Sequence, residues 1–389
     1  MFETLTDLPA DKILALMDAY RADPRTDKID LGVGIYKNAK GETPVMRAVK
    51  AAEKRIWETQ DTKKYTGLAG EAAYSEAMIG LLFGGNAPDL AAIATPGGTG
   101  AVRQAVELVK MARPGATIWL SDPTWPNHPS IIDHMGVTRK SYRYFDNATC
   151  AVDEAGMLED LAKVEAGDVV LLHGCCHNPT GANPTADQWD KIVAVLQDRG
   201  AVPFIDIAYQ GFGDGLEDDA AATRKITAAF PEVMIAASCS KNFGIYRERT
   251  GLLMVKSGEK AIMQKTLNHL NRQNYSFPPD HGARIVTEIL SNADLRADWE
   301  AELEETRLGM LELRQQLASE LRQQTNSDAF DFVAQHRGMF SRLGLTPEQV
   351  EKLKADHGVY MVGDSRINIA GLNADTVPLL AKAVASVLD

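Results

Sequence analysis

Cysteine is scarce in this 389-residue sequence, which has four, at positions 150, 175, 176 and 239. They form no CxxC pair or His-spaced zinc pattern, so the sequence predicts neither a disulfide scaffold nor a metal site. Thiols used this sparingly are typical of a reducing, intracellular compartment. The sequence also lacks an apolar run of the roughly 18 residues that a membrane-spanning helix needs, and it begins without the basic and apolar regions of a signal peptide. We therefore expect a soluble, cytoplasmic protein.

Positive charge is also in short supply, because 41 lysines and arginines face 53 aspartates and glutamates, for a formal charge of −12. A nucleic-acid-binding protein needs a basic face to neutralise phosphates, so this balance argues against nucleic acid as a partner. A transcription regulator would also need a basic helix-turn-helix arm, and none is present. Anionic small-molecule substrates would require positive charge concentrated at one place.

Repeats, low-complexity tracts and long linkers are absent, and the length suggests two domains. Between residues 90 and 255, short apolar stretches alternate with helical ones, which is typical of a mostly parallel sheet covered by helices on both faces. The expected strands are Ala91–Thr95, Thr117–Ser121, Val169–His173, Val202–Ala208, Met234–Ser238 and Leu252–Val255. The fold class is therefore α/β, and ligands should bind at the carboxyl ends of the strands.

Helices outside this block are predicted from apolar spacing and end signals. Two expected helices are Asp11–Tyr20 and Asp294–Gln324. A third has Thr43 as its N-cap and Pro44 at its first position, and it ends near Thr59. A fourth starts at the capping box Thr346–Gln349 and ends at Gly358. Strands near Val359–Val362 and Arg366–Ala370 and a final helix to Val387 give the C-terminal part an α+β pattern.

Lys241 follows a buried apolar strand, and Arg249 stands eight residues later. Most lysines are solvated surface residues. A lysine held in a pocket, however, can lose its proton and attack a carbonyl as a Schiff-base nucleophile. Ser238 and Arg249 supply donors suited to a phosphate, the arginine in bidentate geometry. A lysine beside a phosphate site suggests pyridoxal phosphate as the cofactor.

Asp206 lies near the end of another buried strand, in Phe204–Tyr209. A buried carboxylate is costly unless it is paired, so Asp206 is either a satisfied structural group or the partner of a ligand. Next to a pyridine nitrogen it would keep that nitrogen protonated and make the ring an electron sink. Tyr209, three residues later, could hydrogen-bond the phenolic oxygen of such a ring.

Three further segments each have a structural alternative. The turn Pro96–Ala101 precedes an amphipathic helix and could offer N–H groups to a phosphate, or it could be only a strand–helix turn; it is not a P-loop. Trp125 could stack on a planar ring or belong to the core. Asn178 precedes Pro179 at a strand end, where Asn-Pro-Thr-Gly is also a good turn.

Two arginines and a glycine pair complete the candidates. Arg366 starts an apolar strand, where a guanidinium would bind a fixed anion such as a substrate carboxylate. Arg272 is a second candidate anion clamp, or else a surface arginine. Gly32 and Gly34 lie in an apolar run and indicate either a bulge or a close approach of backbone to a ligand.

Together these segments resemble the class I aminotransferases, in the branch of the aspartate and aromatic-amino-acid enzymes, and most closely the bacterial aromatic-amino-acid enzymes. The matching segments occur in family order and spacing over essentially the whole chain: Gly32–Tyr36, Tyr65–Gly67, Gly97–Ala101, Asp122–His128, His173–Gly181, Asp206–Phe212, Ser238–Gly251, Arg272–Pro279 and Arg366–Gly371. Ser-Lys-Asn-Phe-Gly, with an arginine eight residues after the lysine, is the most specific of them.

The resemblance implies a role for each candidate. Lys241 would be catalytic and carry pyridoxal 5'-phosphate as a Schiff base. The cofactor would be bound by Tyr65, Gly98, Thr99, Trp125, Asn178, Asp206, Tyr209, Ser238 and Arg249, with His128 supporting Asp206 from behind. Substrate would be bound by Gly34, Trp125, Asn178, Arg272 and Arg366, where Arg366 takes the α-carboxylate and Arg272 a distal one.

The resemblance also implies the architecture. It predicts the type I fold of pyridoxal-phosphate-dependent transferases, with a mostly parallel seven-stranded sheet in a large domain (44–305) and a smaller α+β domain (11–43 and 306–389) after an arm of residues 1–10. It predicts a homodimer in which Tyr65 and Arg272 serve the site of the neighbouring subunit. Cis peptide bonds are expected at Asp122-Pro123 and Asn178-Pro179.

The implied reaction is ping-pong transamination of aromatic (Tyr, Phe, Trp) and dicarboxylic (Asp, Glu) L-amino acids, with 2-oxoglutarate as acceptor. Phe277 favours the aromatic enzymes, whereas Arg272 suits dicarboxylic substrates. A strict aspartate aminotransferase is the alternative. A β-lyase or decarboxylase on the same architecture is a minor one, because a fold does not determine a reaction.

Overall fold

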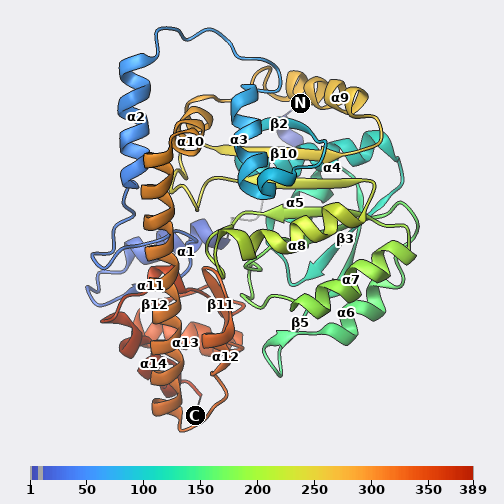
Figure 1. Ribbon diagram of the computed structural model, residues 1–389. Helices are drawn as coiled ribbons and strands as arrows, with labels where there is room; N and C mark the ends of the chain where they lie inside the picture. Colours follow the sequence, from blue (N-terminus) through green and yellow to red (C-terminus); the bar gives the residue numbers. More distant parts are fainter. Residues whose placement is uncertain (1, 8–11, 389) are drawn as a thin grey trace. The chain divides into compact units, whose positions relative to one another are not determined.

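The computed structural model describes residues 2–7 and 12–388 and divides into two compact units (Figure 1). Unit 1 comprises Met1–Thr43 and Met310–Asp389, and unit 2 comprises Pro44–Gly309. Of the expected arm, residues 1 and 8–10 lie outside the described residues, and Phe2–Thr4 form a short 3-10 helix, η1.

Unit 2 is built on a seven-stranded sheet with the order β2-β10-β9-β8-β7-β3-β4. The strands are β2 (Ala91–Pro96), β3 (Thr117–Asp122), β4 (Thr138–Arg143), β7 (Val169–His173), β8 (Val202–Ile207), β9 (Val233–Ser238) and β10 (Thr250–Lys256). β10 is antiparallel to both of its neighbours, and the other pairings are parallel. The predicted α/β class with a mostly parallel seven-stranded sheet is confirmed.

Six of the seven strands were expected from their apolar residues, and β4 was missed. Its sequence, Thr-Arg-Lys-Ser-Tyr-Arg, is polar, and Tyr142 is its one buried residue. β4 lies at the edge of the sheet and pairs only with β3. Because an edge strand needs little apolar surface and commonly carries charged residues, hydrophobic patterning does not reveal it.

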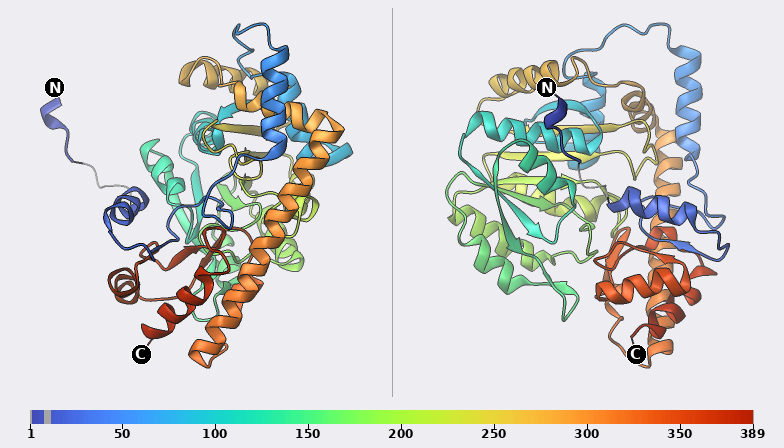
Figure 2. Two further views of the ribbon diagram at one scale, coloured as in Figure 1. Left: turned by 90° about the vertical axis from the view of Figure 1, so that its left-hand side faces the viewer. Right: turned by 180° about the vertical axis from the view of Figure 1, so that it is seen from behind.

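Helices cover both faces of this sheet, as the views in Figures 1 and 2 show. Those of unit 2 are α2 (Arg47–Thr59), α3 (Ala72–Phe83), α4 (Gly97–Ala112), α5 (Asn127–His134), α6 (Glu154–Leu161), α7 (Ala186–Asp198), α8 (Leu216–Ala229), α9 (Lys260–Asn274) and α10 (His281–Ser291). The hydrophobic face of α4 packs on β9 and β10 and forms one core with them, which includes Val102, Val106 and Leu253. Short pairs β5 (Phe145–Asp146) and β6 (Ala151–Val152) lie outside the main sheet.

The expected start of the helix that ends at Thr59 was wrong. α2 begins at Arg47, and Met46 at its N-cap makes no side-chain hydrogen bond. The Thr43 hydroxyl instead donates to the carbonyl of Tyr36 at 2.9 Å. A carboxylate from another helix caps α2, because the backbone N–H of Arg47 donates to Glu302 at 2.8 Å. Such a distant partner leaves no signal in the local sequence.

Unit 1 is a smaller α+β body with its own core, which includes Leu317, Val350 and Leu380. Its elements are α1 (Lys12–Ala22), the C-terminal part of α11 (Ala293–Thr325), α12 (Phe332–Gln335), α13 (Pro347–His357), α14 (Thr376–Ser386), η3 (Ile369–Gly371) and the strand pairs β1 (Ile29–Asp30) with β12 (Val359–Tyr360) and β11 (Phe340–Arg342) with β13 (Arg366–Asn368). The predicted capping box of α13 is confirmed at Thr346 and Gln349, and Gly358 ends that helix in a left-handed conformation.

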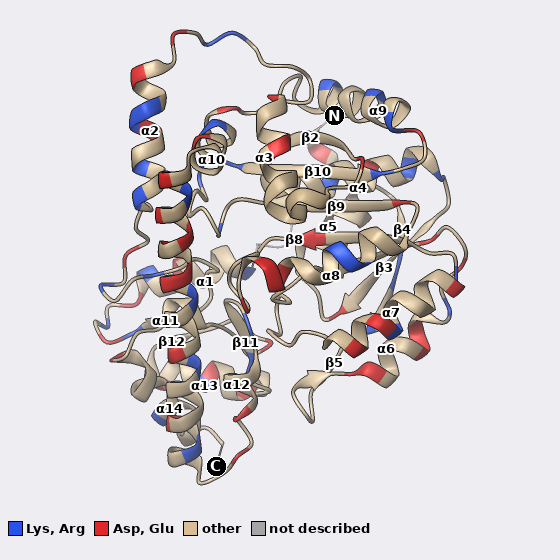
Figure 3. Cartoon of the chain, in the orientation of Figure 1, with Lys and Arg blue, Asp and Glu red and all other residues tan. Residues whose placement is uncertain are grey.

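Acidic residues are spread over the outer helices of unit 2, including α6 and α7 (Figure 3). Basic residues of α2 face acidic ones of α11: Arg47 lies 2.9 Å from Asp298 and 3.8 Å from Glu302. All four cysteines are buried, and no disulfide joins them. Over residues 2–7 and 12–388, no helix is both long and apolar enough to span a membrane.

Candidate active site

Lys241 lies just beyond the carboxyl end of β9, as the sequence predicts. Its amine is 4.8 Å from the centre of the Tyr209 ring, at a cation–π distance. Burial lowers the pKa of Lys241 to about 8, with a further contribution from the positive charge of Arg249, while Asp206 acts in the opposite direction. An amine with this pKa is mostly protonated at pH 7, but it releases its proton far more readily than an ordinary lysine and can then serve as nucleophile or base.

Asp206 and His128 form a close pair behind this lysine. Parallel pairing of β7 and β8 sets His173 beside Asp206, near the carboxyl ends of both strands. From α5, Nε2 of His128 lies 2.8 Å from Oδ2 of Asp206. Burial alone would raise the pKa of Asp206, but the hydrogen bond from His128 and electrostatic attraction from His128 and Lys241 outweigh it, so the pKa is lowered. Asp206 is therefore held as a carboxylate.

Two residues that the sequence did not single out extend this network. Thr124 Oγ1 lies 2.9 Å from Nδ1 of His128 and 3.2 Å from Nε2 of His173. Burial is the main cause that lowers the pKa of His173 to about 3, so its ring is neutral. The contacts that run from Asp206 through His128 and Thr124 to His173 therefore orient the carboxylate. The signal for His173 was its position at the end of a strand beside that of Asp206; Thr124 had none.

Trp125 and Asn178 come from the two loops that contain cis peptide bonds. Both expected bonds, Asp122-Pro123 and Asn178-Pro179, are cis. The Trp125 ring meets the His128 ring edge-on, with centroids 5.1 Å apart. Asn178 is buried, and so is Tyr209. These side chains are thus brought to the same end of the sheet as Asp206.

A cradle for a phosphate lies between the first turn of α4 and Arg249. A Cβ at Gly97 would fall 2.5 Å from the Arg249 guanidinium, and one at Gly98 would fall 2.9 Å from Cβ of Ser238. Only glycine therefore allows Arg249 and Ser238 to reach the N-terminus of α4, which Thr99 also occupies. Backbone N–H groups, a helix dipole, hydroxyls and a guanidinium fit a phosphate. Together with Lys241 and Asp206, this donor set fits pyridoxal phosphate.

Tyr65 and Arg272 lie elsewhere on unit 2, at its surface. Tyr65 is 85% exposed, and its ring stacks on Phe277 with centroids 4.8 Å apart. The exposed Arg272 lies 5.7 Å from the centre of the same Phe277 ring and donates from Nη1 to the Ser276 hydroxyl at 2.6 Å. The structure therefore gathers Tyr65, Phe277 and Arg272 into one exposed stack.

Gly34 and Arg366 belong to unit 1. Arg366 is buried in β13 and donates from Nη2 to the carbonyl of Gly32 at 2.6 Å. The Phe340 ring lies 4.5 Å from its guanidinium carbon and also fills the space beside Gly34, where a Cβ would be 2.7 Å from the ring. The two predicted residues are thus joined through one aromatic side chain.

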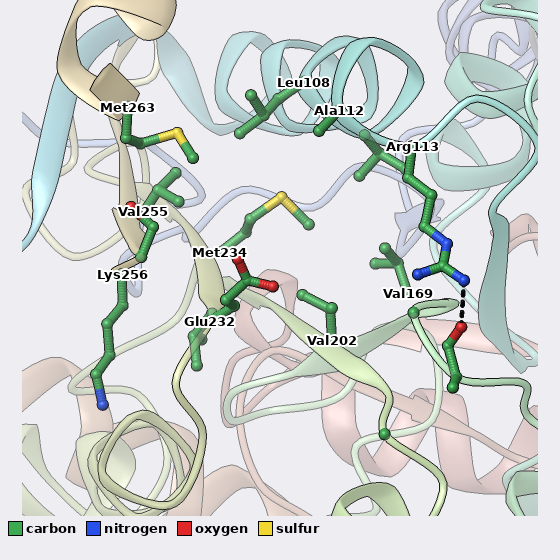
Figure 4. A pocket seen from close by; sticks show the side chains of 16 residues that line it. Leu108, Ala112, Arg113, Val169, Val202, Glu232, Met234, Val255, Lys256 and Met263 are labelled. Atoms are coloured by element: carbon green, nitrogen blue, oxygen red, sulfur yellow. Dashed lines mark hydrogen bonds between the residues drawn. The ribbon is translucent and has the colours of Figure 1, made fainter. Parts of the chain in front are cut away.

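Two other features of unit 2 belong to none of the predicted site residues, although the Cys176 thiol lies 4.0 Å from the backbone carbonyl of Tyr209. Cys175, Cys176 and Asp219 bring two Sγ atoms and a carboxylate within 4.8 Å of one another. Asp219 already accepts backbone N–H bonds from Gly211, Gly213 and Asp214, which holds that turn in place. A cavity of about 610 Å³ opens at the amino ends of β7, β8 and β9 and is lined mainly by apolar side chains such as Leu108, Val169, Val202, Met234 and Met263 (Figure 4). None of the predicted site residues lines it.

Comparisons with known proteins agree with this geometry. The family model for aminotransferase class I and II matches residues 26–384. An aromatic-amino-acid aminotransferase of Paracoccus denitrificans is 59% identical over 100% of both chains, and an aspartate aminotransferase of Haemophilus influenzae is 41% identical over 100% of both. A crystal structure of an aromatic-amino-acid aminotransferase from Burkholderia pseudomallei, covalently bound to pyridoxal phosphate, covers 100% of both chains with a TM-score of 0.98 and 39% identity. The chain therefore belongs to the class I and II aminotransferases, a family of enzymes that use pyridoxal phosphate.

Proposed function

We propose that this aminotransferase acts on aromatic and dicarboxylic L-amino acids, with 2-oxoglutarate as the acceptor. The observation that carries the proposal is the buried amine of Lys241, whose pKa is about 8, on the same sheet end as the Asp206–His128 pair. The similarity to aromatic-amino-acid and aspartate aminotransferases supports both substrate classes.

Each residue near Lys241 has a defined task in this proposal. Ser238, Arg249, Thr99 and the backbone at Gly98 hold the cofactor's phosphate, while Trp125, Tyr209 and Asn178 hold its ring. When bound, the cofactor supplies the electron sink for the reaction. Lys241 takes the α-proton of the substrate amino acid and later returns it. Asp206, oriented by His128, keeps a negative charge next to the ring nitrogen.

Substrate carboxylates require cations in this acidic protein. Arg366 is assigned to the α-carboxylate, because a buried guanidinium at the start of a short strand offers a fixed, planar fork. The backbone at Gly34 is close to Arg366 through Phe340 and is assigned to the same end of the substrate. Arg272 is assigned to the distal carboxylate of aspartate, glutamate and 2-oxoglutarate.

A homodimer with shared sites accounts for the exposed stack on unit 2. A tyrosine that is 85% exposed beside an exposed arginine is poorly placed to serve a buried site of its own chain. We therefore assign Tyr65 and Arg272 to the site of a second copy, where Tyr65 would contact the cofactor phosphate. Unit 2 and unit 1 would be the large and small domains, preceded by the arm of residues 1–10, and the enzyme would act in the cytoplasm.

Aromatic substrates raise a specific difficulty for Arg272. An apolar ring beside a buried, unpaired guanidinium is unfavourable, so we propose that Arg272 moves aside when phenylalanine or tyrosine binds. The exposure of Arg272 and its contacts with Ser276 and Phe277 support this, since none of these partners is a carboxylate that would hold it. A strict aspartate aminotransferase would have no need for such movement.

A single-turnover experiment on the cofactor-loaded enzyme tests the proposal. Aspartate and phenylalanine are added separately, and conversion of the cofactor to its amine form is followed by absorbance. We expect both to react at comparable rates, and Arg272→Leu to slow aspartate by about 100-fold (about 2.7 kcal/mol, a buried charge-assisted pair) while changing phenylalanine by less than about threefold.

Lys241→Ala is the control for this experiment, because it should bind pyridoxal phosphate but show no steady-state turnover. Substantial turnover by that variant would contradict the assignment of Lys241. Reaction with aspartate alone would leave a plain aspartate aminotransferase and reject the aromatic assignment.

A further inference from the structure

Arg314, a buried arginine in unit 1, has no task in the function proposed above. It lies on α11 and is 0% exposed. Its Nη1 donates to the carbonyl of Val333 at 3.1 Å and to the Ser341 hydroxyl at 2.7 Å. Its Nη2 donates to the carbonyls of Gly338 at 2.8 Å and Phe340 at 2.7 Å. Hydrogen bonds from a charged donor are about twice as strong as neutral ones, so this guanidinium clamps the backbone that it contacts.

The clamped backbone leads directly into β11. Phe340 is the first residue of that strand and pairs with Asn368 of β13, while Arg342 pairs with Arg366. The Ser341 hydroxyl is fixed a second time, by Nδ1 of His336 at 3.1 Å. Arg314 therefore sets the position from which the Phe340 side chain projects.

The Phe340 ring in turn lies against the guanidinium of Arg366, 4.5 Å from its carbon. A guanidinium binds a carboxylate in its own plane, through two parallel N–H bonds. Because the guanidinium carbon lies over the Phe340 ring, this ring limits the directions in which the guanidinium plane can point. The carbonyl of Gly32, which accepts from Nη2 at 2.6 Å, fixes one edge of it. Contacts thus run without interruption from Arg314 through Phe340 to Arg366.

We propose that Arg314 is a positioning residue for recognition of the substrate's α-carboxylate. It acts by holding Phe340, whose ring orients the fork of Arg366. The inference rests on the proposed role of Arg366 as the α-carboxylate clamp. Because every amino acid substrate carries an α-carboxylate, the effect of Arg314 must be the same for aspartate and for phenylalanine. This separates it from Arg272, which concerns distal carboxylates alone.

The test uses holoenzyme variants Arg314→Lys, Phe340→Leu and the double variant. Binding of 3-phenylpropionate, which carries a carboxylate but no amine, is measured by calorimetry, and KM and kcat are measured for aspartate and phenylalanine. We expect each single change to raise the Kd and both KM values about tenfold, with kcat within about threefold. The double variant should be no worse than the more affected single one, because residues that act through one route are not additive.

Arg322→Lys is the matched control. Arg322 lies on the same helix but is exposed and pairs with Asp331, so this change should alter neither Kd nor KM. Unchanged Kd in Arg314→Lys together with a lowered Tm would reduce Arg314 to a purely structural residue and overturn the proposal. Additive effects in the double variant would also overturn it. Should Arg314→Lys fail to fold, Ser341→Ala removes one of its four acceptors and must raise Kd in the same direction by a smaller factor.

Arg366→Leu separates failure of this inference from failure of the proposed function. If Arg366→Leu leaves the Kd of 3-phenylpropionate unchanged, the role of Arg366 itself is wrong. If Arg366→Leu weakens binding but Arg314→Lys and Phe340→Leu do not, only the positioning role is refuted.

Discussion

The lowered pKa of Lys241 predicts an unusual dependence of stability on pH in the cofactor-free protein. Its pKa is about 8, against an ordinary value of 10.5, and this interval corresponds to about 3 kcal/mol of unfavourable free energy for the charged form in the folded state. Between pH 8 and 10.5 the unfolded chain holds a proton on this lysine that the folded protein has released. The free energy of unfolding therefore rises with pH across this window.

Replacing Lys241 by methionine removes this contribution. Below pH 8 the wild-type protein carries the full penalty, so Lys241→Met should be the more stable by about 3 kcal/mol, in addition to any gain from apolar packing. The difference in free energy of unfolding between the two proteins should decrease as pH rises from 8 and be smallest near pH 10.5. Urea unfolding of both cofactor-free proteins at half-unit steps from pH 7 to 10 measures it.

The exposed Lys265 provides the matched control, since Lys265→Met corrects for the general effect of removing one amine from an acidic protein. A stability difference between wild type and Lys241→Met that stays constant from pH 7 to 10 would refute the reasoning. So would a difference that grows with pH, because the sign follows directly from which state holds more protons.

Two further changes test the site. Gly97→Ala places a Cβ 2.5 Å from the Arg249 guanidinium at a residue with φ of 72°. Its backbone strain of about 1–2 kcal/mol predicts a roughly five- to thirtyfold loss of pyridoxal phosphate affinity. Gly80→Ala, which meets no atom within 4 Å, should lose none, and equal affinities of the two variants would contradict the cradle. Asp206→Asn removes the charge that faces the ring nitrogen and should lower turnover about 100-fold or more, whereas His128→Asn, which removes only the group that orients Asp206, should lower turnover by a smaller factor. Steady-state rates per bound cofactor measure both effects. A larger loss in His128→Asn than in Asp206→Asn would be evidence against these roles.

Local sequence patterns determined much of unit 2 and the ends of several helices. Six strands of the sheet can be predicted from their apolar runs, because a strand that is buried on both faces consists mainly of apolar residues. The capping box at Thr346 is equally local, since its donors and acceptors lie within four residues. The positions of Lys241 and Asp206 at strand ends followed from the same patterns, as did the mostly parallel order that brings such ends together.

Contacts between distant segments were decided by the tertiary structure alone. Glu302, rather than Thr43, caps α2, and Thr124 joins His128 to His173. In neither case does the local sequence around one residue indicate which distant residue it contacts. The role of Phe340 against Arg366 is of the same kind. A residue's type and near neighbours determine whether it favours a strand, a cap or a turn, but which side chain meets it from far along the chain depends on packing that exists only after folding. The sequence thus predicted which residues could form this site, whereas the contacts that orient their side chains could not be predicted from it.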